Sequence, residues 1–221
     1  MSYGELSNTQ ETMVLPMLQM KNIRGKPYIT VSAKGMINGL SNIPNDGADF
    51  GPDTTEGATA PGQYGSPYTE TCGIQDAVSY AYSNSLHKIH LSLGIFKIST
   101  AKLIGSEVAS WVTGNDTDVV YFWGSILVPE LNPDGSSFDL EIEGSGEALS
   151  FTAPTNQGTI IYVPNSTVGQ VSIASGGTQT STYYSVIVAD TPIANTASDL
   201  SNKIHVKEFT VRFESNTQSH D

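Results

Sequence analysis

The stretch from residue 42 to residue 100 decides the fold. It begins with the turn-rich IPNDGADFGPDT (residues 43–54), followed after a loop by GIQDAVSYAYSN (residues 73–84) and KIHLSLGIFKIS (residues 88–99). The second segment has apolar residues at the spacing of one helix face, namely Ile74, Ala77, Val78 and Ala81. The third alternates apolar and polar residues up to Gly94, as two short strands joined by a turn do. The order therefore predicts a loop, a capping helix at about residues 73–84, and a pair of strands.

The same alternation returns in the second half of the chain, at residues 138–143, 159–163, 185–189 and 203–213. Short strands with small polar turns and no helices between them do not form a sheet of alternating strands and helices. They form the coils of a solenoid, in which each coil buries the inner face of its neighbour. A β-sandwich also contains many short strands, but it does not account for the helix before the first one.

Residues 45–49, 73–77 and 89–98 resemble the opening of the pectate-lyase-like superfamily of right-handed parallel β-helices. That superfamily includes pectin-degrading enzymes and many phage tailspike or tail-fibre proteins. The chain departs from the pattern in its long loop after Asp53 and in Ser92-Leu93, which replace a proline turn. The resemblance implies an all-β fold, a right-handed parallel β-helix with an N-terminal capping helix and an extended N-terminal arm.

The resemblance carries no active-site motif. Catalytic residues of the superfamily lie on coils in the middle of the solenoid, well after the opening unit. The chain therefore looks like the front end of a longer β-helix or an unusually short one, and its catalytic residues, if it has any, are unknown.

Residues 1–40 are predicted to form an arm or attachment segment, and residues 41–221 the coils. Within the arm, KPYITVSAKGMING (residues 26–39) alternates in the manner of a strand. Two interpretations stay open: a strand that caps the body, or an arm that holds another subunit or a larger assembly.

Composition narrows the classes of partner. The chain has 221 residues and a formal net charge of −12, so nucleic acid and anionic membranes are repelled. No apolar run is long enough to span a membrane, and the first residues lack the features of a signal peptide. Neutral glycans, cations and other protein surfaces remain open. Cys72 is the single cysteine, which excludes a disulfide within the chain.

Asp139, Glu141 and Glu143 alternate, so their carboxylates are expected on one face of a strand. Such a row suits Ca²⁺, or an acid and base pair acting on a sugar, and these three residues are the weak metal candidates. The alternative is a solvated outer face. If this strand stacked beside residues 203–207, pairing with Lys203, His205 and Lys207 would explain both rows without a ligand.

Other constellations give weaker signals. Tyr121 and Trp123 suit stacking on a sugar, with His205 as a further glycan contact, although a core position or a subunit contact is the competing interpretation for the aromatic residues. Asp46, Asp49 and Asp53 are typical of a turn. The four histidines have no metal-ligand spacing, no cofactor motif is present, and no Gly-x-Ser-x-Gly elbow occurs.

We therefore expect a virion tail or surface-appendage protein, located on the virion or an extracellular surface, with a β-helical shaft that is structural or recognises glycans. The arm is expected to contact protein partners. Assembly as a homo-oligomer is expected too, and the resemblance alone favours a trimer. The alternatives are a polysaccharide lyase or glycoside hydrolase acting on an extracellular polysaccharide, and a non-catalytic carbohydrate-binding module.

Overall fold

The computed structural model describes residues 28–34, 48–108, 119–132, 135–147, 158–171, 181–190 and 204–214. Most of the predicted arm lies outside them, as do Asp46 and Lys203. The described chain is rich in strands: β1 (Ile29–Val31), β2 (Lys88–Leu91), β3 (Gly94–Lys97), β4 (Lys102–Val108), β5 (Val119–Pro129), β6 (Leu140–Glu143), β7 (Thr159–Val163), β8 (Ser181–Asp190), β9 (Ile204–Lys207) and β10 (Thr210–Phe213). Two helices accompany them, α2 (Ile74–Ser83) and the short α4 (Asn165–Val168).

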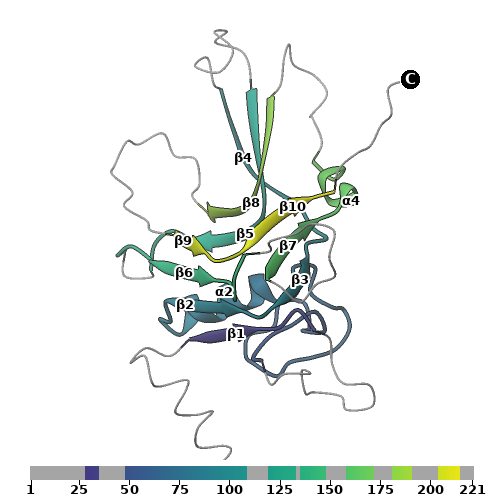
Figure 1. The fold of residues 1–221 in the computed structure, drawn as a ribbon. Helices are drawn as coiled ribbons and strands as arrows, with labels where there is room; N and C mark the ends of the chain where they lie inside the picture. The colour runs from purple at the N-terminus through teal and green to yellow at the C-terminus, as the bar shows by residue number, and fades with distance from the viewer. Residues whose placement is uncertain are drawn as a thin grey trace, which may run out of the picture.

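Two sheets form the body of the molecule, and their strands stack in chain order (Figure 1). The first sheet has the order β1-β2-β6-β9 and the second has the order β3-β7-β10, with every neighbouring pair parallel. The chain passes from the first sheet to the second three times, at β2 to β3, β6 to β7 and β9 to β10. The predicted strand-rich fold with parallel sheets is confirmed.

Alternation along each strand supplies the core. In the first sheet Ile89 lies beside Ile142 in the register, and both side chains are fully buried. In the second sheet Phe96 and Ile161 form the equivalent buried pair. Polar residues between these positions point outward, because successive side chains of a strand lie on opposite faces.

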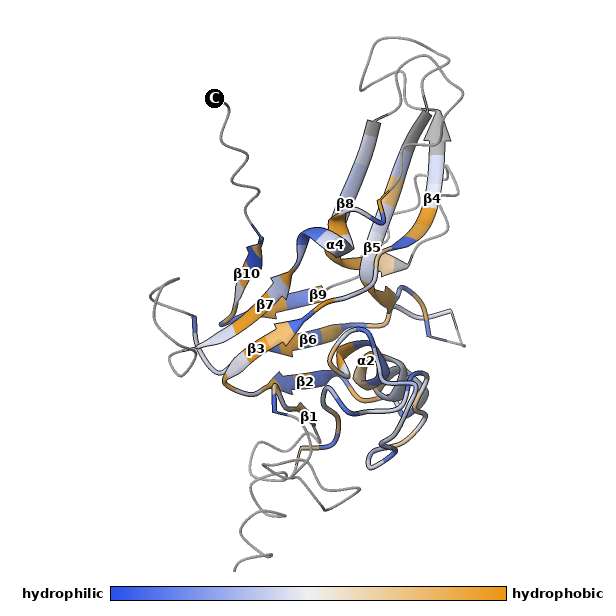
Figure 2. Ribbon diagram, turned by 90° about the vertical axis from the view of Figure 1, so that its right-hand side faces the viewer, coloured by the Kyte–Doolittle hydropathy of each residue, from blue (hydrophilic) through white to orange (hydrophobic). Residues whose placement is uncertain are grey.

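A third sheet, with the order β4-β5-β8, departs from the prediction that all neighbouring strands run parallel. β4 and β5 pair antiparallel, whereas β5 and β8 pair parallel. The two antiparallel strands are consecutive in the chain, and residues 109–118 between them are fewer than a parallel crossover usually needs. Their outer parts extend away from the body in both views (Figures 1 and 2). Gly124 allows close packing there, because a Cβ would lie 2.5 Å from Cγ1 of Val188.

Helix α2 packs against β1, β2 and β5 with its predicted apolar face, Ile74, Ala77, Val78 and Ala81, fully buried. Its bounds agree with the predicted helix. Gly73 is the N-cap residue, in a left-handed conformation, and the Thr71 hydroxyl before it accepts a hydrogen bond from the backbone N–H of Gln75 in the first turn. The Gln75 side-chain amide bonds both backbone groups of Leu127, at 2.7 and 3.1 Å, and so joins the helix to β5.

The outer edge of β1 is covered by residues 48–50. Asp49 accepts hydrogen bonds at 2.9 Å from the backbone N–H and from the hydroxyl of Thr30, and the N–H of Ser32 donates to the carbonyl of Phe50. The turn predicted from the Asp and Gly residues therefore closes the first edge of the first sheet. Together with α2 it seals the N-terminal end of the stack.

Candidate functional site: a charged ladder on the first sheet

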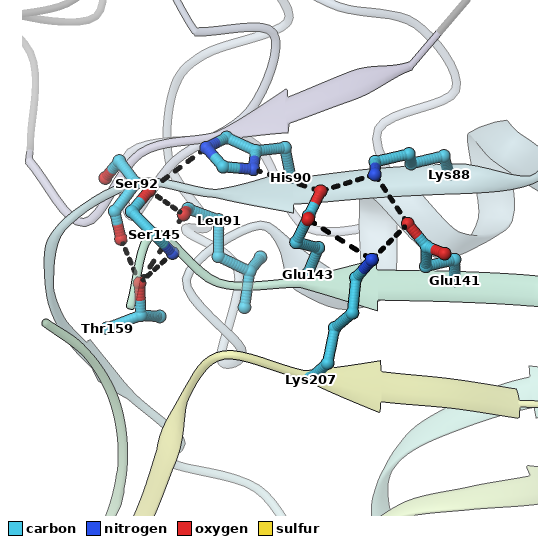
Figure 3. Close-up of polar contacts among 9 residues, drawn as sticks. All are labelled: Lys88, His90, Leu91, Ser92, Glu141, Glu143, Ser145, Thr159 and Lys207. Atoms are coloured by element: carbon cyan, nitrogen blue, oxygen red, sulfur yellow. Dashed lines mark hydrogen bonds and ion pairs between the residues drawn. The ribbon is translucent and has the colours of Figure 1, made fainter. Parts of the chain in front are cut away.

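Charged side chains cross the outer face of the first sheet in register (Figure 3). β2 supplies Lys88 and His90, and β6 supplies Glu141 and Glu143. On β9, His205 lies beside Glu141 and Lys207 beside Glu143. We call Lys88, Glu141, Glu143 and Lys207 the charge ladder.

Each lysine of the charge ladder contacts both glutamates. Nζ of Lys207 lies 3.3 Å from Oε1 of Glu141 and 3.3 Å from Oε1 of Glu143. Nζ of Lys88 lies 2.5 Å from Oε1 of Glu141 and also pairs with Oε2 of Glu143. Two cations therefore balance two anions, and the pairs link β2, β6 and β9 across the sheet.

These contacts shift the pKa values of the charge ladder in the direction that keeps it ionised. Hydrogen bonds from Lys88 are the largest influence on Glu141 and Glu143 and lower the pKa of each carboxyl, against the opposing effect of burial. Hydrogen bonds to Glu143 and Glu141 raise the pKa of Lys207. Burial lowers the pKa of Lys88, but its bonds to the two glutamates outweigh that effect and the pKa is raised.

His90 and Ser145 continue the polar network beyond the ladder. Ser145 Oγ lies 3.0 Å from Nε2 of His90 and donates to the carbonyl of Leu91 at 2.7 Å. The Ser145 hydroxyl hydrogen is thus used, so the imidazole donates from Nε2 to the hydroxyl oxygen. Oε2 of Glu143 lies 3.9 Å from Nδ1 of the same ring.

This order of carboxylate, imidazole and hydroxyl is the order of a catalytic triad, but its hydrogen bonds run the wrong way. A nucleophilic serine donates its proton to the imidazole, whereas Ser145 donates to a backbone carbonyl. Its backbone N–H donates to Oγ1 of Thr159 at 2.8 Å, and Thr159 in turn donates to the carbonyl of Ser92. The group therefore joins the turns after β2 and β6, and it does not activate a nucleophile.

The metal candidates of the sequence fall into two kinds. Glu141 and Glu143 are bound by lysines, whose charge competes with any cation. Asp139 is exposed and precedes β6, and its carbonyl oxygen lies 2.8 Å from Nδ1 of His87. Within the described ranges, no group of three or more His, Cys, Asp and Glu side chains is arranged to hold a metal ion.

The predicted glycan contacts lie in different sheets. Tyr121 and Trp123 are half-buried on β5 in the third sheet, whereas His205 is exposed on β9 in the first. The indole N–H of Trp123 is buried and has no hydrogen-bond partner. The opposite face of the same strands carries Phe122 and Tyr183, whose rings stack with their centroids 5.9 Å apart. The sequence carries no local signal for this pair, because Tyr183 faces Phe122 only through the pairing of β5 with β8.

Cys72 has no reactive character. Its side chain is buried, and burial raises the pKa of the thiol to about 11, so that the thiolate is scarce at neutral pH. Sγ lies 3.2 Å from the carbonyl oxygen of Lys97.

Comparisons with family models, with curated proteins and with solved structures found no match to the chain. Among the described elements, neither helix has the length and apolar character needed to cross a membrane.

Proposed function

We propose that the chain forms the first coils of a right-handed parallel β-helix and serves as a structural shaft in a virion tail or another surface appendage. The observation that carries the proposal is the order of the two parallel sheets, in which each pass of the chain adds one strand to each sheet. Stacked coils of this kind extend along one axis, and every coil depends on contacts with the next.

The outer face of the first sheet suits a mechanical role. Lys88, Glu141, Glu143 and Lys207 are paired with one another across three strands, so these four side chains connect neighbouring strands and none of the four is left unpaired to act on a substrate. A glycoside hydrolase needs two carboxyl groups free to exchange protons or to attack the sugar. Glu141 and Glu143, the paired carboxylates within the coils, are each held by two lysines, which favours the shaft over the enzyme.

Recognition of a neutral glycan by the same protein is supported by the stacked pair on the third sheet. Tyr183 is 45% exposed and lies on β8 in the third sheet. An exposed aromatic face binds the apolar face of a sugar ring without needing charge. The net charge of −12 disfavours acidic glycans at the same surface.

The location is tested by immunogold electron microscopy with an antibody raised against this chain, applied to particles and cells from the producing culture. We expect gold on tails or other appendages, and none with serum depleted on the purified chain. Gold confined to the cell interior contradicts the proposal.

The choice between shaft and enzyme is tested by incubating the chain with a panel of polysaccharides and measuring new reducing ends and unsaturated products, alongside binding to a glycan array. We expect binding without turnover, and weaker binding for Tyr183→Ala. The matched control is Tyr68→Ala, because Tyr68 is 52% exposed on a loop far along the chain from the third sheet. Turnover of any polysaccharide overturns the structural assignment.

A further inference from the structure

Apolar residues at core positions continue onto the last strand of each sheet, but there their side chains are only partly buried. Val206 on β9 follows Ile89 and Ile142 in the register, yet it is 50% exposed whereas they are fully buried. Val211 and Phe213 on β10 lie beside the fully buried Ile161 and Val163 and are 40% and 48% exposed. Inward-facing apolar side chains of both sheets are therefore partly exposed at the same end, where Phe213 also packs edge to face against Tyr184 of β8, with ring centroids 6.1 Å apart.

The edges at this end are also free in the topology of the described strands. β9 and β10 are the last strands of their sheets, at the end opposite to the one sealed by residues 48–50 and α2 (Figure 1). An edge strand presents a row of backbone N–H and C=O groups, which is a template for another strand. We call the outer surface of β9 and β10 the open rung.

The charges of the first sheet indicate what kind of strand fits. β2 carries the basic residues Lys88 and His90 on either side of Ile89, and β6 carries Glu141 and Glu143 on either side of Ile142, directly beside them. β9 returns to the first pattern in the same register, with His205, Val206 and Lys207. From β2 to β9 the sign of the ladder therefore alternates from strand to strand, whereas β1 is uncharged and places Thr30 beside His90. An acidic strand beside β9 would continue this alternation.

We infer that the open rung binds a strand pair of a partner protein, of which one strand adds parallel to β9 with acidic residues beside His205 and Lys207 and an aliphatic residue over Val206. The second strand of the pair covers Val211 and Phe213 on β10. The interaction is β-augmentation, in which main-chain bonds supply affinity and alternate side chains supply specificity. The inference rests on the proposed function, since it requires parallel coils.

A second copy of this chain fits the open rung poorly. Two copies that met end to end through this surface would bring together two β9 strands, each of which carries the basic residues His205 and Lys207. Like charges on directly facing strands are destabilising. An acidic partner strand instead repeats the contacts that β6 already makes with β2.

The test uses a fluorescein-labelled peptide with the sequence FDLEIEGSG, which reproduces residues 138–146 of this chain and therefore the acidic strand β6. Its binding to the full chain is measured by fluorescence anisotropy. The matched control peptide, FDLKIKGSG, carries lysine in place of both glutamates. We expect saturable binding of the acidic peptide that salt weakens, and binding of the control peptide that is about tenfold weaker or absent.

Three variants locate the binding. Val206→Asp and Lys207→Ala are expected to weaken the acidic peptide about tenfold. Val168→Asp, which changes a valine that is 40% exposed on α4, is expected to leave it unchanged. Equal binding of the two peptides, or equal effects of all three variants, overturns the inference.

Sedimentation velocity, together with the stability of the variants, distinguishes an acidic partner strand from two other possible covers of the open rung: a second copy of the chain and a segment of the same chain. A dimer of the unaltered chain that Val206→Asp converts to a monomer identifies a second copy as the occupant and overturns the inference. Absent peptide binding together with strong destabilisation by Val206→Asp shows that the chain covers this end itself, with the same consequence. Either failure leaves the shaft proposal standing if the parallel pairing of β2, β6 and β9 is confirmed independently by NMR.

Discussion

The two ends of the stacked sheets differ in how well the apolar interior is covered. At the N-terminal end, α2 lies over the apolar interior, and Asp49 and Phe50 take up the backbone groups of β1. At the other end, β9 and β10 carry inward-facing Val206, Val211 and Phe213 with substantial exposure. The sealed end is covered by a helix and a turn that lie close together in the sequence. The open rung instead has the alternating apolar and polar residues of a strand in the interior of a sheet.

The difference shows how the two parallel sheets bury their inner faces. An inner face is buried only when another strand or a covering segment lies beside it. Among the described elements, residues 48–50 and α2 form such a cover at β1. No described strand lies beyond β9 and β10, which agrees with the exposure of Val206, Val211 and Phe213.

The largest effect is expected from substituting phenylalanine at the two ends. Phe96 is fully buried in the second sheet, and Phe213 is 48% exposed in the same sheet. Phe96→Ala should lower the free energy of unfolding by about 3–5 kcal/mol, because it leaves a cavity in the core. Phe213→Ala should lower it by about 1 kcal/mol or less, because half of the side chain is already in water. Equilibrium unfolding in urea measures both, and equal losses would contradict the contrast.

A smaller effect is expected at the contact between β6 and the turn that joins β9 to β10. A Cβ added to Gly144 would lie 2.1 Å from the backbone oxygen of Glu208, so the turn must shift. Gly144→Ala should lower the free energy of unfolding by up to about 3 kcal/mol. Gly51→Ala is the control, since the nearest atom to its added Cβ, the backbone oxygen of Ser32, is 3.4 Å away. Urea unfolding of both variants tests the tight stacking, and an unaffected Gly144→Ala would show that the coils are looser there.

The seal at β1 is tested at Asp49. Asp49→Ala removes the acceptor of both hydrogen bonds from Thr30 and should lower the free energy of unfolding by about 2 kcal/mol. Asp49→Asn keeps one oxygen in place and should lose less. Amide hydrogen exchange at Thr30 gives a local measure, with faster exchange expected in the alanine variant. Unchanged exchange at that amide would mean that the turn does not seal the edge.

The smallest effect is expected from the charge ladder. A double-mutant cycle of Lys88→Met and Glu143→Gln should give a coupling of about 1 kcal/mol at neutral pH, because the pair is partly exposed to water. A cycle that pairs Glu143→Gln with Lys102→Met, a change at an exposed lysine on β4, should give none. Equal coupling energies in the two cycles would show that the Lys88–Glu143 pair makes no specific contribution to stability.

The pH dependence of the same contribution has a definite sign. The carboxyl pKa values are lowered, so the stabilisation is complete above their ordinary value of 4.5 and is lost as the pH falls through the lowered values. The pKa of Lys88 is raised from 10.5, so stabilisation is complete below that value and is lost as the pH rises through the raised one. Urea unfolding across this range should show both losses, each reduced in Glu143→Gln.

Much of the body follows from short-range patterns in the sequence. The apolar spacing of Ile74 to Ala81 predicts α2, and alternation predicts the strands around Ile89 and Ile142, because each pattern reflects burial of one face. The sequence predicts that the row of Asp139, Glu141 and Glu143 pairs with Lys203, His205 and Lys207 if the two strands stack. The strands do stack, and Lys207 pairs with Glu141 and Glu143, whereas Lys203 lies outside the described residues.

The contacts that the sequence does not predict are those set by the register between strands far apart in the chain. Lys88 and His90 were recognised as the polar positions of a strand, but their contact with Glu141 and Glu143 follows from how residues far apart in the chain align. The antiparallel pairing of β4 with β5 was missed for a different reason. A repeat of parallel coils was expected throughout, and the third sheet has its own local connection.

The most direct test of the stack is the pattern of nuclear Overhauser effects between neighbouring strands in the intact, isotope-labelled chain. Parallel strands give contacts between amide and α protons, whereas antiparallel pairs bring α protons of the two strands together. We expect the parallel pattern along Ile89, Ile142 and Val206, together with the antiparallel pattern between β4 and β5. Strong contacts between α protons of β2 and β6, or of β6 and β9, would contradict the stacked parallel sheets on which the shaft and the open rung depend.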